Sequence, residues 1–465
     1  MTSPLPALVP RLASWRRETG ATLALSGPLA LTNLAQVAMG TTDVMMMGWL
    51  GPDTLAAGAL GVNLYFIALI LGIGLLSAAA PMIARERGRD PDTTEAVRAT
   101  VWQGMWSAVC LAPPCWIVLW WTEPLLIALG QDTALAAQAA VYVHALQWAL
   151  LPSWAYVVLR GFVSALERPG WSLAIGLAAV AVNAAANWCL MLGHCGCQAL
   201  GIAGSGLATL VSSVLMVLAL GVVTCRAAPF RRFRLLSGSW RPDGPRLRAF
   251  WRLGLPMAAM LSFEVTMFNA AIFLMGLLGT AALAAHSIAI QLASLTFMVP
   301  LGIAQAAAVR VGRAHGARDR EAVRLAGWTA LGLAVAFMAV MSVTMIVAPR
   351  LLISAFLDAA DPGNARVAAL ATSFLMFAAL FQIADGAQAV GAGMLRGLHD
   401  ARVPMLFALT GYWGIGLPLG VVLAFPAGLG GIGLWIGLAA GLTIVAGLML
   451  WRWLRREALG LLLGP

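Results

Sequence analysis

The chain is divided into apolar blocks of roughly 20 to 30 residues, and short polar breaks separate them. Of its 465 residues, 61% are apolar and 10% are charged, and the mean hydropathy is +0.87. A soluble domain has about 45–50% apolar and about 25% charged residues. One block, folded as a helix, is long enough to cross a hydrocarbon core about 30 Å thick. We therefore expect an all-α polytopic membrane protein.

Twelve such blocks are predicted to be transmembrane helices. They cover approximately residues 21–47, 54–82, 99–121, 134–158, 167–192, 201–225, 252–278, 282–309, 326–348, 367–392, 403–425 and 429–451. No cleavable signal sequence is visible, because residues 1–20 are polar and the first apolar block is too long for a signal core.

The basic residues predict the orientation in the membrane. All 29 are arginines, and all but Arg350 and Arg366 fall in the two terminal segments or in one alternate set of loops. By the positive-inside rule, both termini face the cytoplasm, as an even number of spans requires. The same distribution explains the net charge of +10, so we expect no nucleic-acid partner.

The two halves of the chain resemble each other. A shift of 228 positions aligns Pro28 with Pro256 and MGWLGPDTLAAG at 47–58 with MGLLGTAALAAH at 275–286, and the triplet LRG recurs at 159–161 and 395–397. This predicts two parallel six-helix repeats, an arrangement typical of transporters with a cavity between the repeats.

The repeats define the expected domains. These are a cytoplasmic segment at 1–20, lobes at 21–225 and 252–452, a cytoplasmic linker at 226–251 and a tail at 453–465. The arginines and aromatic residues of the linker allow either contact with anionic lipid headgroups or simple solvation.

Three carboxylates lie well inside apolar blocks: Asp43, Glu264 and Asp385. An acid at the centre of a membrane helix costs about 2.5–3.5 kcal/mol, so each needs a reason to persist. We expect no basic side chain beside them, which leaves room for a proton, a metal cation or a cationic substrate. Low dielectric disfavours the charged carboxylate, which favours binding of H⁺ or Na⁺. Structural hydrogen bonds between helices are the alternative.

Neutral polar residues share faces with these acids. Asn33, Gln36, Gly40 and Asp43 follow helical spacing, and further stripes lie on other predicted helices. The candidate cavity or cation-binding residues are Gln36, Asn183, Asn187, Gln291, Gln382 and Gln388. Interhelical hydrogen bonding is an equally open interpretation for them.

No motif for catalysis, nucleotide or cofactor binding is present, so we expect neither an enzyme nor ATP-driven transport by this chain alone. GHCGC (193–197) offers His194, Cys195 and Cys197, but a metal site needs about four ligands and no matching pair occurs elsewhere. We therefore expect a structural or incidental role for it.

Several segments together resemble the multidrug and toxic compound extrusion family, of the NorM type. They are TTDVMMMGWLG (41–51), VNAAANW (182–188), FEVTMF (263–268), AAHSIAIQLASLTFMVPLGIAQAAAVRVG (284–312) and QIADGAQAVGAGMLRGLHD (382–400). The resemblance spans about residues 20 to 450.

The resemblance implies two six-helix lobes that form a V-shaped cavity. It also implies a cation site at Glu264 and Asp385 in the C-terminal lobe and another at Asp43, Asn183 and Asn187 in the N-terminal lobe. This chain departs from the family pattern at Phe381, where many relatives carry Tyr, and at Gln291, where Asn is common. Both departures affect the expected coordination and the choice of ion.

The expected function is secondary multidrug efflux. Lipophilic, mostly cationic compounds would leave through the bacterial inner membrane in exchange for Na⁺ or H⁺, by a transporter that works as a monomer among membrane lipids and contributes to antibiotic resistance. Methionine and tryptophan side chains suit a plastic pocket for such cations. The alternative is a flippase of lipid-linked oligosaccharides from the same superfamily, for which we would expect cationic cavity residues.

Overall fold

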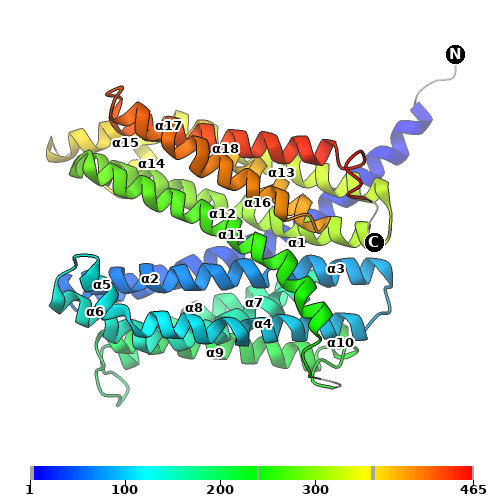
Figure 1. Cartoon of the computed structure of the whole chain (residues 1–465), viewed down its shortest axis with the longest axis horizontal. Coiled ribbons are helices and arrows are strands. Elements are labelled where there is room, and N and C mark those ends of the chain that lie inside the picture. The colour runs from blue at the N-terminus through cyan, green and yellow to red at the C-terminus, as the bar shows by residue number, and fades with distance from the viewer. Residues whose placement is uncertain (1–4, 238–239, 358–361, 463–465) are drawn as a thin grey trace. The chain divides into compact units, whose positions relative to one another are not determined.

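The computed structural model describes residues 5–237, 240–357 and 362–462, and all regular secondary structure in these ranges is helical (Figure 1). The expected all-α architecture is confirmed. Residues 1–4 and 463–465 of the predicted terminal segments lie outside the described residues. Residues 238–239 of the predicted linker also lie outside them.

The helices form two compact units, each of which combines parts of both repeats. Unit 2 contains residues 31–258, and unit 1 contains residues 1–30 and 259–465. Two long helices are therefore divided between the units, α1 (Leu5–Gly48) after Ala30 and α11 (Gly244–Leu277) after Ala258.

The other helices each belong to one unit. Unit 2 contains α2 (Pro52–Leu76), α3 (Ala79–Arg89), α4 (Glu95–Trp120), α5 (Thr122–Ala128), α6 (Thr133–Leu146), η1 (Gln147–Ala149), α7 (Leu150–Ala165), α8 (Gly170–Leu190), α9 (Ile202–Arg226) and α10 (Ala228–Arg231). Unit 1 contains α12 (Thr280–Gly316), α13 (Arg320–Val347), α14 (Pro349–Ser354), η2 (Pro362–Asn364), α15 (Ala365–Gly397), α16 (Arg402–Ala408), the π-helical segment η3 (Leu409–Gly416), α17 (Leu417–Ala424) and α18 (Gly430–Leu454).

The predicted blocks coincide with these helices. Within the described residues, ten continuous helical runs are long and apolar enough to cross a membrane, and the pair α4 and α5, bent by 56°, adds an eleventh if it is one span. The first predicted block lies within α1. The protein is therefore a multi-pass membrane protein.

Several helices continue beyond their apolar blocks. Arg160, Arg310 and Arg396, which the sequence places in polar loops, lie on α7, α12 and α15. Arginine is a good helix former, so a drop in hydropathy marks the end of an apolar block without ending the helix. These guanidinium groups therefore have fixed positions on rigid elements.

The described part of the predicted linker packs along α4. The indole N–H of Trp102 donates to the Leu235 carbonyl at 2.8 Å, and that of Trp106 donates to the Trp240 carbonyl at 2.7 Å. The rings of Trp102 and Trp240 stack with their centroids 4.6 Å apart. A tryptophan N–H that finds a carbonyl partner lets its ring pack closely, so this segment is anchored to unit 2.

Small residues allow close helix packing in unit 1. A Cβ atom at Gly393 on α15 would meet the carbonyl oxygen of Ala304 on α12. Association of helices in a membrane depends on close van der Waals packing, so glycine at such a crossing brings two backbones together.

We expect Gly393→Val to destabilise the protein by about 1–3 kcal/mol, because the added atoms overpack the α12–α15 crossing. The measurement is thermal unfolding of detergent-solubilised protein. Gly332→Val is the matched control, since no atom lies within 4 Å of a Cβ at this exposed helical glycine. Equal midpoints for the two variants would contradict the packing argument.

Candidate functional site

In unit 2, the Asp43 carboxylate is buried and bonded through both oxygens. Asn187 Nδ2 on α8 donates to Oδ1 at 2.7 Å, and Thr209 Oγ1 on α9 donates to Oδ2 at 2.9 Å. Asp43 is 6% exposed, and Asn183 and Asn187 are fully buried. The spacing of i and i+4 places both asparagines on the face of α8 toward this acid. The structure thus joins Asp43, Asn183 and Asn187, as the resemblance implied.

The same cluster contains polar atoms without partners. Asn183 Nδ2 and Asn187 Oδ1 are buried and make no hydrogen bond within the described residues. Asn187 Nδ2 also contacts the Asn183 backbone oxygen at 3.0 Å. Buried polar groups normally have hydrogen-bond partners, so the unpaired amide oxygen of Asn187 is available as a ligand beside the Asp43 carboxylate. Oxygen ligands of this kind suit H⁺ or Na⁺.

The polar face of α1 that carries Asp43 also accepts hydrogen bonds from the Arg160 guanidinium group. Arg160 Nη1 donates to Asn33 Oδ1 at 3.2 Å and to Gln36 Oε1 at 3.4 Å. Gln36, predicted as a cavity residue, thus helps to hold a guanidinium group two helical turns from Asp43. Sequence reasoning missed this contact because Arg160 was assigned to a loop.

In unit 1, Glu264 on α11 and Asp385 on α15 interact electrostatically. Glu264 is half-buried, whereas Asp385 is 6% exposed. Asp385 Oδ1 is buried and makes no hydrogen bond within the described residues. The structure thus brings together the two acids that the sequence analysis paired.

A guanidinium group lies near this acid pair. Arg396, on the same helix as Asp385, interacts electrostatically with Glu264 and donates to the Ala392 carbonyl at 3.2 Å. The expectation that no basic side chain accompanies the acids is therefore wrong for Glu264. The reason is that α15 continues to Gly397 and carries Arg396 into the packed interior.

The three predicted glutamines of unit 1 differ in their environments. Gln388 lies beside Glu264, although its buried amide atoms make no hydrogen bond of ordinary geometry in the described chain. Gln382 Nε2 donates to Thr296 Oγ1 on α12 at 2.6 Å. Gln291 is exposed on α12, and the structure does not bring it into the acid cluster.

The π-helical segment η3 contributes a residue that the sequence analysis missed. Tyr412 is fully buried, its hydroxyl has no partner among the described residues, and it interacts electrostatically with Glu264 and Asp385. The neighbouring Trp413 indole donates to the Phe263 carbonyl at 3.3 Å, which ties η3 to α11. A π-helical turn often marks a functional site, but no simple sequence period announces one.

An aromatic cluster surrounds the position one turn before Asp385. Phe381, fully buried, lies 5.5 Å from Trp435 between ring centroids, and the buried His286 lies 5.4 Å from Trp435. Phenylalanine offers no hydroxyl here, so its side chain adds no hydrogen bond to this part of the site.

The GHCGC segment contributes no metal site that the structure supports. Among the described residues, no group of three His, Cys, Asp or Glu side chains could hold a metal ion. His194 instead stacks on Trp188 with ring centroids 4.2 Å apart, and Cys195 and Cys197 are exposed.

Comparison with known families agrees with the repeat. The sequence model of the MatE family matches twice, at residues 28–189 and 256–422. The two matches begin at the residues that the predicted shift of 228 aligns, Pro28 and Pro256.

Known proteins resemble the chain along nearly its whole length. It is 60% identical to the probable multidrug resistance protein NorM of Mesorhizobium japonicum, over 95% of each chain. It is 51% identical to the protein of the same name in Brucella suis biovar 1, over 96% of this chain and 94% of the relative. Among solved structures, the eukaryotic MATE transporter AtDTX14 superposes with a TM-score of 0.85 at 22% identity, covering 95% of this chain and 96% of that one.

The fold and the family matches define a multidrug efflux transporter and exclude an enzyme. The chain belongs to the MatE family of multidrug and toxic compound extrusion transporters and is of the NorM type.

We expect Asn187→Ala to lower stability by about 1–3 kcal/mol, because Asp43 Oδ1 loses its donor while it stays buried. Thermal unfolding in detergent measures the loss, and Asn63→Ala, at an exposed asparagine on α2, is the control. Combined with Asp43→Asn, the substitution should cost less than the sum of the two single changes. Additive losses would show that the two side chains do not interact.

Proposed function

We propose that this transporter is a secondary antiporter that exports lipophilic, mostly cationic compounds in exchange for Na⁺ or H⁺ by alternating access. The observation that carries the proposal is the acid pair of unit 1, in which Asp385 has a buried oxygen without a partner beside Glu264. The exchange partner and the class of substrate rest on the chemistry of this site.

Charge balance favours a monovalent cation. When Glu264 and Asp385 are both ionised, Arg396 offsets only one of the two negative charges. Two neighbouring carboxylates in a low-dielectric site resist joint ionisation, so one proton or one Na⁺ relieves the repulsion. A cationic drug relieves the same repulsion by replacing the ion.

Exchange follows from competition for this charge. A ligand shifts a conformational equilibrium only through its different affinity for the two states. If the ion and the drug favour opposite states and exclude each other, the transporter changes state only when one of them is bound. A membrane potential contributes about 2.3 kcal/mol per charge per 100 mV if the cycle moves net charge.

Unit 2 offers a second ion site of a different kind. Asp43 has neutral donors on both oxygens and the free amide oxygen of Asn187 nearby. We propose that Asp43 binds H⁺ or Na⁺ alongside Asn183 and Asn187. Because its surroundings differ from those of Asp385, the two acids can respond to different ions or different steps.

We expect Asp385→Asn to reduce gradient-driven efflux to the leak rate. The measurement uses purified protein in liposomes loaded with a fluorescent lipophilic cation, under an imposed Na⁺ or pH gradient. Asp43→Asn tests the second acid in the same assay, and Asp53→Asn, at an exposed aspartate in the first turn of α2, is the control. Unchanged efflux by Asp385→Asn contradicts the mechanism, and no movement of any cation by the wild type favours the flippase alternative.

We further propose that the protein lies in the bacterial inner membrane with both termini in the cytoplasm, because the arginines concentrate on one side. A green fluorescent protein fused to the C-terminus should fluoresce, since this fusion matures only in the cytoplasm. A C-terminal alkaline phosphatase fusion should be inactive, and the opposite pattern would reverse the orientation.

A further inference from the structure

The first helix of each repeat begins among the helices of the other repeat. Residues up to Ala30 of α1 pack in unit 1, and residues 244–258 of α11 pack in unit 2. The crossing points correspond under the shift of 228 residues, as do two close approaches: Gly302 meets Ala30, and Gly74 meets Ala258. We call residues 244–258 and the part of α1 up to Ala30 the exchanged segments.

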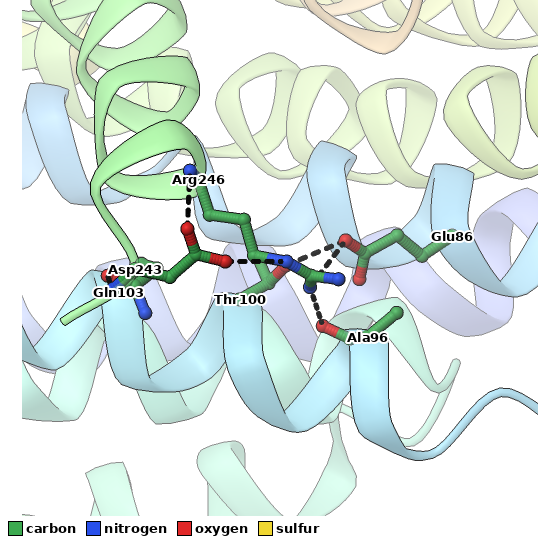
Figure 2. Close-up of polar contacts among 6 residues, drawn as sticks. All are labelled: Glu86, Ala96, Thr100, Gln103, Asp243 and Arg246. Carbon is green, nitrogen blue, oxygen red and sulfur yellow. Dashed lines mark hydrogen bonds and ion pairs between the residues drawn. The ribbon is translucent and has the colours of Figure 1, made fainter. Parts of the chain in front are cut away.

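A polar cluster fastens the start of α11 to unit 2 (Figure 2). Arg246 Nη1 donates to the Ala96 carbonyl at 3.1 Å and lies 3.9 Å from Glu86 Oε1. Arg246 Nε pairs with Asp243 Oδ2 at 3.3 Å, and Glu86 Oε1 accepts a hydrogen bond from Thr100 Oγ1 at 2.8 Å. One arginine thus joins the exchanged segment to both α3 and α4.

Further contacts extend this attachment along α4. The Asp243 backbone N–H donates to Gln103 Oε1 at 3.2 Å, and the Trp251 indole donates to Ser107 Oγ at 3.0 Å. Ser107 is completely buried. The exchanged segment of α11 therefore covers the Ser107 side chain on α4.

The ion pair at the centre of the cluster is incomplete. Glu86 Oε2 is buried and makes no hydrogen bond within the described residues, and the 3.9 Å approach of Arg246 is longer than a hydrogen bond. A buried acceptor left without a donor is unfavourable. This contact therefore holds the segment more weakly than a two-pronged pair would.

The exchanged segment of α1 is held by an ion pair of its own, in which the first helix supplies the acid. Arg310 on α12 donates from two guanidinium nitrogens to both carboxylate oxygens of Glu18 in unit 1. Glu18 is 9% exposed. The shift of 228 residues aligns Glu18 with Arg246, so the same place on the first helix carries an acid in one repeat and a base in the other.

We propose that the Glu86–Arg246 and Glu18–Arg310 pairs are clasps that hold the exchanged segments in one transport state and open in the other. This proposal rests on the alternating access proposed above. Because α1 and α11 each continue from one unit into the other, a movement of the units either bends these helices or frees their starts. The incomplete pair at Arg246 makes the start of α11 the segment that is released first.

The test measures how fast a buried cysteine under the clasp reacts. Ser107→Cys, introduced into a chain with its six native cysteines replaced, is treated with a membrane-impermeant maleimide in right-side-out and in inside-out vesicles. We expect Arg246→Glu to increase the labelling rate by about five- to thirtyfold from one side only, the factor that 1–2 kcal/mol gives. Glu86→Arg should act likewise, and the double exchange of the two charges should restore slow labelling.

The control is another arginine–glutamate pair outside the clasp. On α13, Arg324 Nη2 lies 2.5 Å from Glu321 Oε1, and both side chains are largely exposed. Arg324→Glu breaks this pair and should leave the labelling rate of the Ser107→Cys thiol unchanged. Glu86→Gln, which keeps the Thr100 hydrogen bond, should raise labelling less than Arg246→Glu does. If the charge-reversal variants do not fold, the labelling rate of Glu86→Gln tests the clasp instead.

Slow labelling in Arg246→Glu and Glu86→Gln, with normal protein yield, overturns the clasp. Fast labelling that the double exchange does not restore also overturns it, because the two charges then do not act as a pair. Labelling needs no substrate or ion gradient. Unchanged labelling with intact efflux therefore rejects the clasp alone, whereas absent gradient-driven efflux by the wild type rejects the proposed antiport alone.

Discussion

Charge within the apolar interior is the constraint on which the rest of this structure depends. In hydrocarbon, each polar group must find its partner inside the protein, which limits the backbone to helices and makes every buried side-chain charge costly. The helices meet this requirement in different ways around Asp43, whose oxygens are both bonded, and around Asp385, where one oxygen is left without a partner. The second arrangement leaves a buried carboxylate oxygen without a hydrogen bond among the described residues.

The two repeats share a topology but differ in their polar chemistry. The repeated LRG triplet places Arg160 and Arg396 at corresponding positions, yet the first bonds to neutral amides and the second interacts with Glu264. Each repeat therefore combines the same kind of residues into a different electrostatic environment.

Hydropathy was sufficient to locate the apolar helices, because a run of apolar residues long enough to cross the membrane has few other solutions. It did not locate the helix ends, since arginine continues a helix as readily as it interrupts an apolar block, and Arg396 was therefore missed as a neighbour of Glu264. Asp43, Asn183 and Asn187 were found because helical spacing and family resemblance agreed. Tyr412 was not found, because a π-helical turn shifts its side chain out of the ordinary period.

The opposite charges at Glu18 and Arg246 have a consequence for the interchangeability of the halves. A chain made of two N-terminal repeats would place a second copy of Glu18 against Glu86, and a chain made of two C-terminal repeats would place Arg246 against Arg310. Both combinations bring like charges together, whereas the natural order brings opposite charges together at both places. The two halves are thus complementary in the manner of a heterodimer, and neither can replace the other despite their common fold.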